Sequence, residues 1–231
     1  MSEAAPTNNA GLSAAQIEAL NQKYAPMDFE ARIHALYQDF DPEKVLVTSS
    51  FAATSAHFLH IISRFRPSQR IAFIDTGYHF PETLQYKQFL TDEFKLDVFD
   101  LKAEDWKHQF TLSEKTWQRD PDFCCSINKV EPLEAAKVNY HVWVSSLMRW
   151  QTEHRATLPV FEERRGILKF NPMIDITREE RDEYIRAHGL KLHPLVEHGY
   201  SSIGCLHCTM PGEGRSGRWA GKPKAECGLH L

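Results

Sequence analysis

"KVLVTSSFAATSAHFLHIISRF", residues 44–65, passes from a short apolar run into a segment with helical spacing. The run at residues 45–47 is typical of a buried strand. A turn of small residues follows, and after it apolar side chains recur every three or four positions, which places them on one face of a helix. A strand that leads directly into a helix is the unit from which parallel sheets are built, so this stretch predicts an α/β fold.

The alternation of strand and helix continues along the chain. Strands are predicted within residues 44–50, 70–77, 96–101 and 139–146, and helices within residues 14–24, 28–38, 54–65, 81–94 and 176–189. The first and last helices carry capping boxes, Ser13 with Gln16 and Thr177 with Glu180, and Gly189 ends the last helix. This order of elements predicts a parallel sheet with helices on both faces.

Length and composition indicate one globular domain with appendages. The chain has 231 residues, of which 42% are hydrophobic and 25% charged, enough to bury a sizeable core. A net charge of −4 gives no general attraction to nucleic acid or to a membrane. We find neither a secretory signal nor an apolar run long enough to span a bilayer. We therefore expect a cytoplasmic, reducing setting, and the sequence leaves a homo-oligomer open.

Composition also divides the chain into three parts. Residues 1–40 are expected to form an N-terminal helical segment, and residues 41–210 a nucleotide-binding α/β domain that carries the metal site. Residues 211–223 contain four glycines and two prolines. This predicts that residues 211–231 form a mobile tail, the segment for which the resemblance described below implies the catalytic residues.

Two polar loops follow the first two predicted strands. Residues 48–55 offer hydroxyls and backbone amides at the start of a helix, where an anion binds readily. Asp75 ends the second strand, and Gly77 frees the backbone for close approach by a ligand. Either loop alone is more often a structural turn. Because the carboxyl ends of parallel strands meet at one edge of a sheet, the two loops together favour a shared nucleotide site.

The cysteines carry the most specific signal. Cys124 and Cys125 are adjacent, and Cys205 and Cys208 have the CxxC spacing that lets two thiolates from one turn hold one metal centre. In a reducing setting, clustered cysteines indicate metal ligands before disulfides. Buried structural cysteine is common for single residues but does not explain a doublet together with a CxxC. The set suits zinc or a four-iron, four-sulfur (4Fe-4S) cluster. The divergent side chains of adjacent residues favour the cluster, in which each thiolate binds a different iron.

Cys227 is left over, in a basic part of the tail. Residues 215–224 contain no acid and four cations, which are Arg215, Arg218, Lys222 and Lys224. Nearby cations favour the nucleophilic thiolate and also bind phosphate or sulfate groups. His230 adds a proton donor or an anion contact. The alternative is a solvated basic end with an incidental cysteine and a surface histidine.

These residues resemble those of a known family. The segments "SSFAATSA", "DTGYHFPET", "CCSINKVEPL", "HGYSSIGCLHCT", "GRSGRW" and "ECGLH" are similar, in this order, to those of the assimilatory adenylyl-sulfate (APS) and phosphoadenylyl-sulfate (PAPS) reductases. The resemblance covers roughly residue 45 to the C-terminus. It implies a parallel-sheet, adenine-nucleotide alpha-hydrolase-like α/β fold with a flexible C-terminal tail. It also implies reduction of adenylyl sulfate to sulfite and AMP through an enzyme S-sulfocysteine, with thioredoxin or glutaredoxin as reductant, in assimilatory sulfate reduction.

The resemblance implies a role for each matching residue. Cys227 matches the nucleophile and His230 a second catalytic residue. The implied ligands of a 4Fe-4S cluster are Cys124, Cys125, Cys205 and Cys208. The implied substrate-binding residues are Ser49, Ser50, Asp75, Thr76, Gly77, Lys129, Arg149, Arg215 and Arg218. Among these, Lys129 matches the lysine that lies between cluster and substrate.

The chain departs from the family pattern in two places. Ala52 stands where the phosphate loop usually has glycine. Ser146 and Met148 stand where a "GxRRxQ"-like run has its glycine and its first arginine, although Arg149 and Gln151 still match that run.

Three alternatives stay open on the sequence. A cluster-bearing reductase that uses PAPS and releases adenosine 3',5'-bisphosphate would carry the same motifs. A zinc-containing adenylating ATPase of related fold would explain the cysteine set but not the terminal "ECGLH". A non-catalytic metal-binding or redox-sensing module would need no nucleophile at Cys227.

Overall fold

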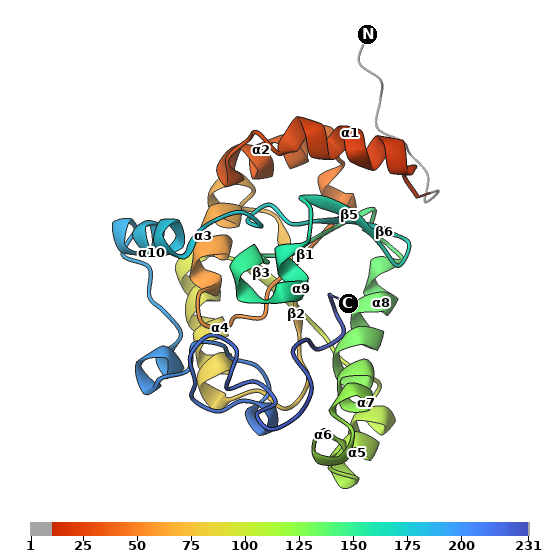
Figure 1. Cartoon of the computed structure of the whole chain (residues 1–231), viewed down its shortest axis with the longest axis vertical. Coiled ribbons are helices and arrows are strands. Elements are labelled where there is room, and N and C mark those ends of the chain that lie inside the picture. The colour runs from red at the N-terminus through yellow and green to blue at the C-terminus, as the bar shows by residue number, and fades with distance from the viewer. Residues whose placement is uncertain (1–10, 231) are drawn as a thin grey trace.

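A six-stranded sheet forms the centre of the computed structural model of the chain, which describes residues 11–230. The first ten residues of the expected N-terminal segment and the last residue of the tail therefore lie outside the described part. The strands are β1 (Val45–Thr48), β2 (Arg70–Ile74), β3 (Asp97–Leu101), β4 (Val142–Val144), β5 (Phe161–Arg164) and β6 (Ile167–Phe170). Their order across the sheet is β3-β2-β1-β4-β6-β5, and Figure 1 labels all of them except β4.

Most of the sheet is parallel, which confirms the predicted α/β fold class. Val47 of β1 pairs with Ile71 of β2 on one side and with Val144 of β4 on the other, so β1 lies in the middle. Parallel pairing brings the carboxyl ends of these three strands to one edge of the sheet, where open α/β folds place their ligand sites.

The sheet is larger than the sequence predicts, because β5 and β6 form a hairpin that adds an antiparallel edge strand. The segment "FEERRGILKF" carries charged residues where a buried strand would have an apolar run. Its turn has Arg165 at φ +50° and Gly166 at φ +81°, the backbone of a two-residue hairpin turn. The Arg-Gly dipeptide was the signal that could have found this hairpin, which the four predicted strands leave out.

Helices cover the sheet. The α-helices are α1 (Ala14–Tyr24), α2 (Phe29–Asp39), α3 (Ser55–Phe65), α4 (Pro81–Phe94), α5 (Asp105–Ser113), α6 (Thr116–Arg119), α7 (Pro121–Cys125), α8 (Glu131–Lys137), α9 (Glu153–Ala156) and α10 (Arg178–Ala187). Short 3-10 turns are η1 (Pro42–Lys44), η3 (Arg149–Gln151), η4 (Pro194–His198) and η5 (Leu206–Cys208), and η2 (Ser126–Val130) is a π-helical turn. The five predicted helices are all present, and both capping boxes form. Within residues 11–230, no helix is long and apolar enough to cross a membrane.

Alternate residues of β1 face opposite sides of the sheet. Val45 and Val47 pack into the larger apolar core, which also takes in α1 and α2 at the top of Figure 1. Leu46 packs into a second cluster with Trp143 of β4 and Leu133 of α8. The sheet is thus buried on both faces, as the apolar run in this strand predicts.

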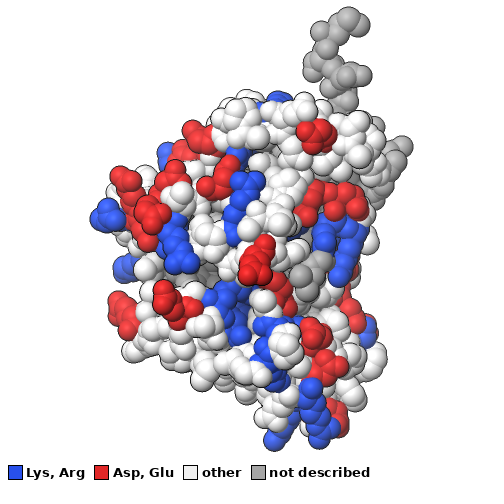
Figure 2. Space-filling view, in the orientation of Figure 1, with Lys and Arg blue, Asp and Glu red and all other residues white. Residues whose placement is uncertain are grey.

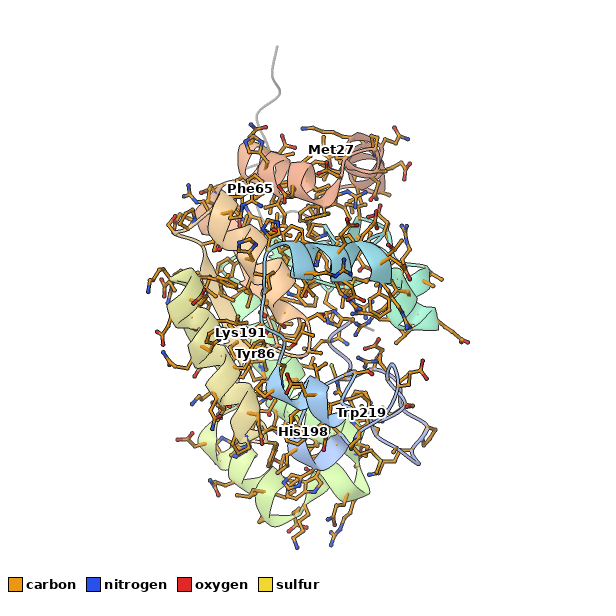
Figure 3. The ribbon with its side chains drawn as sticks, turned by 90° about the vertical axis from the view of Figure 1, so that its left-hand side faces the viewer. Met27, Phe65, Tyr86, Lys191, His198 and Trp219 are labelled. Atoms are coloured by element: carbon orange, nitrogen blue, oxygen red, sulfur yellow. The ribbon has the colours of Figure 1, made fainter. Side chains whose placement is uncertain are left out.

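The segment between α10 and the tail packs against α4 and returns to the carboxyl edge of the sheet. Tyr86 Oη of α4 donates to the carbonyl of Lys191 at 2.7 Å (Figure 3). Farther on, Cys205 forms an isolated antiparallel bridge with His79, just after β2. The CxxC thereby arrives at the same edge as the loops after β1 and β2.

The tail is docked on this edge. Trp219 is only 3% exposed, and Lys222 Nζ donates to the carbonyls of Trp117 at 2.9 Å and Gln118 at 2.7 Å. In Figure 1 the tail crosses below the sheet and its end lies near α8 and α9. This is one position of the tail, and its mobility stays a prediction.

His57 of α3 is buried in an aromatic cluster with α2 and α10. Its ring lies 4.3 Å from that of Tyr184 and 5.4 Å from that of Phe29. Neither ring nitrogen has a hydrogen-bond partner among the described residues. Burial lowers the pKa of His57 to about 4, and the groups that lower this pKa further are Arg181, His60 and His188. His57 is therefore neutral in the folded chain near pH 7.

We expect the free energy of unfolding to fall between pH 7 and pH 5, and His57→Phe to remove part of this fall. The unfolded chain binds a proton at His57 near pH 6.5, whereas the folded chain does so only near pH 4. The contribution of His57 to the free energy of unfolding is therefore present above the unfolded pKa and is lost as the pH drops. The loss is about 2 kcal/mol between pH 7 and pH 5. Urea unfolding at the two pH values measures it.

His34→Phe is the control, because His34 is exposed on α2. This substitution should leave the decrease in free energy of unfolding between pH 7 and pH 5 unchanged. The prediction is contradicted if the wild type and His57→Phe lose equal stability between the two pH values.

Candidate active site

A cleft of about 610 Å³ lies at the carboxyl edge of the sheet, between the loops after β1 and β4 and the docked tail. The predicted site residues that line it are Ser49, Ser50, Lys129, Cys205, Arg215, Arg218, Cys227 and His230. Figure 2 shows Lys and Arg side chains gathered in the middle of this face, where Figure 1 shows the tail. The structure therefore brings most of the predicted residues together, from both ends of the chain.

The loop after β1 forms one wall of the cleft. Ser49 Oγ accepts from the backbone N–H of Phe51 at 3.2 Å. Phe51 has φ +47°, an unusual conformation for a residue other than glycine, and its buried ring packs edge-on against Phe73 at 5.6 Å. A buried aromatic ring thus holds this turn at Phe51, one residue before Ala52, where the family pattern has glycine. The first residues of α3 also line the cleft, so the positive end of that helix dipole lies beside it.

The three predicted residues after β2 lie outside the cleft lining. Asp75 Oδ1 accepts from the backbone N–H of Gly77 at 3.0 Å, and Thr76 Oγ1 lies 3.4 Å from Cys205 Sγ. Gly77 has φ +70°, and a Cβ there would come within 2.5 Å of His108 Cε1. Gly77 therefore makes room for the side chain of His108, whereas the sequence predicted the close approach of a ligand.

The four predicted cluster ligands surround one small pocket next to the cleft. Cys124 and Cys125 end α7, and Cys205 and Cys208 lie at the two ends of the turn η5. Aromatic side chains line the same pocket, namely Tyr78, Trp117 and, on the tail in Figure 3, Trp219. Tertiary structure has therefore joined the doublet to the CxxC.

The four thiols surround this pocket, but within residues 11–230 no group of three or more His, Cys, Asp or Glu side chains is placed to hold a single metal ion. The thiols also have polar neighbours. Asn128 Nδ2 donates to Cys124 Sγ at 3.7 Å, and Thr76 Oγ1 is close to Cys205 Sγ. Such contacts stabilise the thiolate form that a metal binds.

Lys129 lies between the cysteine pocket and the cleft, and it lines both. It stands on the π-helical turn η2, directly after α7. Burial alone would lower the pKa of Lys129, but the thiol groups of Cys205, Cys125 and Cys227 raise it overall. Lys129 is therefore a constant positive charge shared by the cysteine pocket and the tail thiol.

Cys227 is half-buried in the cleft wall with two arginines of the tail. Arg218 is 9% exposed, its Nη1 donates to the carbonyl of Ile203 at 3.3 Å, and its guanidinium lies 4.4 Å from the ring centre of Trp219. Among the described residues, Nε of Arg218 and Nε of Arg215 have no partner. Burial lowers the pKa of Arg215 to about 10, so it stays charged at pH 7. Buried arginines with unmet donors suit the binding of an oxyanion.

His230 stacks on Trp143 of β4, with ring centroids 5.3 Å apart and planes at 7°. Its carbonyl oxygen accepts from His154 Nε2 at 2.6 Å. Burial puts the pKa of His230 well below its usual value, and the cations that add to this effect are Lys169, Arg155, Arg215 and Lys137. In this position His230 is a neutral hydrogen-bonding group and not a cation.

After β4, the cleft is lined by Arg155 and not by Arg149. Arg149 is exposed, and its Nε and Nη2 both donate to the carbonyl of Leu158 at 3.3 Å. Arg155 is 6% exposed and donates to both carboxylate oxygens of Glu226. Sequence reasoning missed Arg155 and Glu226. One signal was available, since Glu226 is the one acidic side chain after Glu213.

The chain is similar to known proteins over most of its length. The sequence profile of the phosphoadenosine phosphosulfate reductase domain matches residues 44–211. An adenosine 5'-phosphosulfate reductase of Mesorhizobium japonicum is 38% identical over 225 residues, which cover 94% of this chain and 87% of that protein. A protein of the same name from Chelativorans sp. is 39% identical and covers 94% and 92%. A phosphoadenosine 5'-phosphosulfate reductase of Gloeobacter violaceus is 34% identical and covers 95% of each chain.

Solved structures share the fold. The phosphoadenylyl-sulfate reductase of Candida auris, in a phosphate complex, aligns with a TM-score of 0.74 at 24% identity, over 88% of this chain and 100% of that one. The FMN adenylyltransferase of Candida glabrata aligns with a TM-score of 0.57 at 12% identity, over 88% and 70%. These likenesses confirm the nucleotide alpha-hydrolase-like α/β fold. The matched domain and the sequence relatives together show that the chain belongs to the phosphoadenosine phosphosulfate reductase family and is an oxidoreductase.

Proposed function

We propose that the chain is an adenylyl-sulfate reductase of assimilatory sulfate reduction, which converts adenylyl sulfate to sulfite and AMP. One observation carries the proposal. Cys227 lines the cleft with Lys129, Arg215 and Arg218 but does not line the neighbouring pocket that the other four cysteines surround, and of those four only Cys205 also reaches the cleft lining. A thiol that is apart from the metal-binding thiols and close to cations is suited to attack an anionic sulfur centre. Relatives at 38% and 39% identity are named for this activity.

In the first step the Cys227 thiolate attacks the sulfur atom of adenylyl sulfate. A bond forms between Sγ and that sulfur, and the bond from the sulfur to the bridging phosphate oxygen breaks. The electron pair leaves with AMP, so negative charge collects on its phosphate, where Lys129 and Arg218 would stabilise it. Ser49 and Ser50 would hold the phosphate from the opposite wall. The enzyme is left as S-sulfocysteine.

Some of the predicted substrate-binding residues lie outside the cleft lining. These are Asp75, Thr76, Gly77 and Arg149. We propose for them a supporting role, in which they shape the nucleotide side of the cleft from behind. His230 would contact the phosphosulfate through a ring nitrogen, and the negative charge of the substrate would offset the cations that now lower its pKa.

In the second step a reduced redoxin, thioredoxin or glutaredoxin, attacks Sγ of Cys227. Sulfite leaves with the electron pair of the broken sulfur–sulfur bond, and a mixed disulfide forms. The second thiol of the redoxin then releases Cys227 as a thiol, so the redoxin supplies two electrons and ends as a disulfide. The tail must leave the cleft to present Cys227 to a protein, and the glycines of residues 211–223 would permit this. The need for a reduced redoxin pool favours a cytoplasmic location.

Cys124, Cys125, Cys205 and Cys208 would hold a 4Fe-4S cluster. When bound, the cluster would supply structural support and electrostatic tuning, because Cys227 and the redoxin provide the electrons. Burial raises the pKa of Cys124 and Cys208, and that of Cys125 to about 12. These thiols are therefore poor nucleophiles compared with a thiol in a cation-lined cleft.

PAPS is a second candidate substrate. Arg178 and Arg181 of α10 also line the cleft and lie over the ring of Trp150, at 4.6 and 4.8 Å from its centre. These cations are additional to those near Cys227 and could bind a 3'-phosphate. The 34% identical relative from Gloeobacter violaceus carries the PAPS reductase name.

We expect the wild type to use adenylyl sulfate with a kcat/KM about tenfold or more above that for PAPS, and Cys227→Ser to form sulfite from neither. Serine is not ionised near pH 7 and cannot form a disulfide with a redoxin. Sulfite release with reduced thioredoxin measures both, and mass spectrometry without reductant should find one SO₃ group on the Cys227 peptide. Full sulfite production by Cys227→Ser would rule out the nucleophile, and a preference for PAPS would select the second candidate.

We expect Gly204→Ala to displace Arg218 and to raise the KM for adenylyl sulfate. A Cβ at Gly204 would stand 2.3 Å from Arg218 Nη2, and Gly204 does not have a positive φ. Alanine therefore moves the guanidinium without straining the backbone. Loss of one charge-assisted contact corresponds to a KM increase of about tenfold. Gly11→Ala is the control, because nothing lies within 4 Å of the added Cβ. Equal KM values in the two variants would contradict the role of Arg218.

We expect anaerobically purified protein to be brown and to contain iron and labile sulfide. Cys208→Ser should lose much of both, because a cluster held by four thiolates then lacks one ligand. Cys227→Ser is the control and should keep the wild-type absorbance, iron and sulfide. A colourless protein with stoichiometric zinc would contradict the proposed 4Fe-4S cluster.

A further inference from the structure

A buried ion pair holds the tail next to Cys227. Glu226, the residue before Cys227, is 3% exposed, and Arg155 of α9 is 6% exposed. Nε and Nη2 of Arg155 donate to Oε1 and Oε2 of Glu226 at 2.7 and 2.8 Å, a bidentate geometry that is both strong and directional. Thr152 Oγ1 donates to Oε1 at 3.1 Å, and Arg215 Nη2 donates to Oε2 at 3.3 Å.

Arg155 is anchored to the body of the protein and not to the tail. Thr152 is the N-cap of α9, and its Oγ1 accepts from the backbone N–H of Arg155 at 3.2 Å. Gln151 Oε1 accepts from Arg155 Nη1. The carboxylate of Glu226 therefore binds a side chain that hydrogen bonds hold within the segment after β4.

The two charges are stable in this place only as a pair. Burial alone would raise the pKa of Glu226, but the hydrogen bond and charge of Arg155, with the charge of Arg215, lower it overall. Removal of one partner leaves the other charge buried without compensation. Because the tail has no helix or strand among its described residues, it can leave the cleft and expose that charge to water.

Other tail contacts lie farther from the thiol. Lys224 pairs with Asp122 of α7, and the carbonyl of His230 accepts from His154. Lys224 and His230 are each three residues from Cys227 in the sequence, whereas Glu226 is directly beside it. The position of the thiol therefore depends most directly on Glu226.

We propose that Glu226 is a positioning residue, whose ion pair with Arg155 latches the tail so that Cys227 faces the nucleotide cleft. Opening of this pair releases Cys227 for reduction by the redoxin. The latch deepens the proposed function, since it assumes that Cys227 is the nucleophile. Neither Glu226 nor Arg155 needs to contact the substrate, because each satisfies the other.

Alkylation of Cys227 tests the latch without an activity assay. Wild type, Glu226→Ala, Arg155→Ala and the double variant are treated with iodoacetamide, and the modified Cys227 peptide is followed by mass spectrometry. We expect each single variant to react about tenfold faster or more, because loss of a buried ion pair frees the tail. The double variant should react at the rate of the single variants, since all three open the same contact.

Glu213→Gln is the matched control. It removes the other acidic side chain of the tail, which is exposed, so its loss leaves no buried charge unpaired. Its alkylation rate and its turnover should equal those of the wild type. Glu226→Asp keeps the charge and should restore part of the protection, which separates a latch from general misfolding.

Kinetics provide a second readout. We expect kcat for adenylyl sulfate to fall by a similar factor, about tenfold, in Glu226→Ala and Arg155→Ala, with KM nearly unchanged, because the thiol is no longer held in place. A rise in KM confined to Arg155→Ala would overturn the latch and assign Arg155 to substrate binding. Wild-type alkylation rates in both single variants would also overturn it, whatever the role of Cys227. If alkylation rises as expected but Cys227→Ser still makes sulfite, Glu226 and Arg155 hold the tail in place, but Cys227 is not the nucleophile and the proposed function fails.

Discussion

Lys129, Arg155, Arg215 and Arg218 converge where the tail crosses the carboxyl edge of the sheet. Buried cations destabilise a protein unless anions or acceptors lie beside them, and here the compensation is uneven. Arg155 and Arg215 share the carboxylate of Glu226, and Lys129 lies in the field of the thiols. Arg218 has a carbonyl and an aromatic ring, with one donor unmet among the described residues. The cleft therefore has positive charge that the protein does not fully compensate, which favours the binding of a polyanionic nucleotide.

The same cations lie near two groups of thiols, to which the proposed function gives different roles. The doublet on α7 and the CxxC lie in a pocket lined with aromatic rings, where burial opposes ionisation unless a metal binds. Cys227 stands apart on a segment without regular structure, beside cations and within reach of the cleft. Lys129 lines both places, so a change of charge in one is felt electrostatically in the other.

Predictions from the sequence succeeded where local spacing sets the structure. The strand–helix unit at residues 44–65 and the capping box at Thr177 depend on neighbours within a few positions. The hairpin of β5 and β6 was missed because its strands are charged and short, and their pairing depends on β4, far away in the sequence. The short helices around the cysteine doublet were missed for a related reason. Elements of four or five residues are held by packing and not by propensity.

For the site, residue chemistry alone separated the four cysteines that we propose as metal ligands from Cys227, the proposed nucleophile, and it identified the cations of the tail. These assignments depend on residue type and spacing, which can be read directly from the sequence. Tertiary structure decided that Arg155 and not Arg149 lines the cleft, and that Asp75, Thr76 and Gly77 lie outside its lining. It also decided that Glu226 binds Arg155, 71 residues away. Such contacts follow from how the tail crosses the sheet. A contact between residues so far apart in the sequence depends on the packing of the whole domain, and no local sequence pattern determines it.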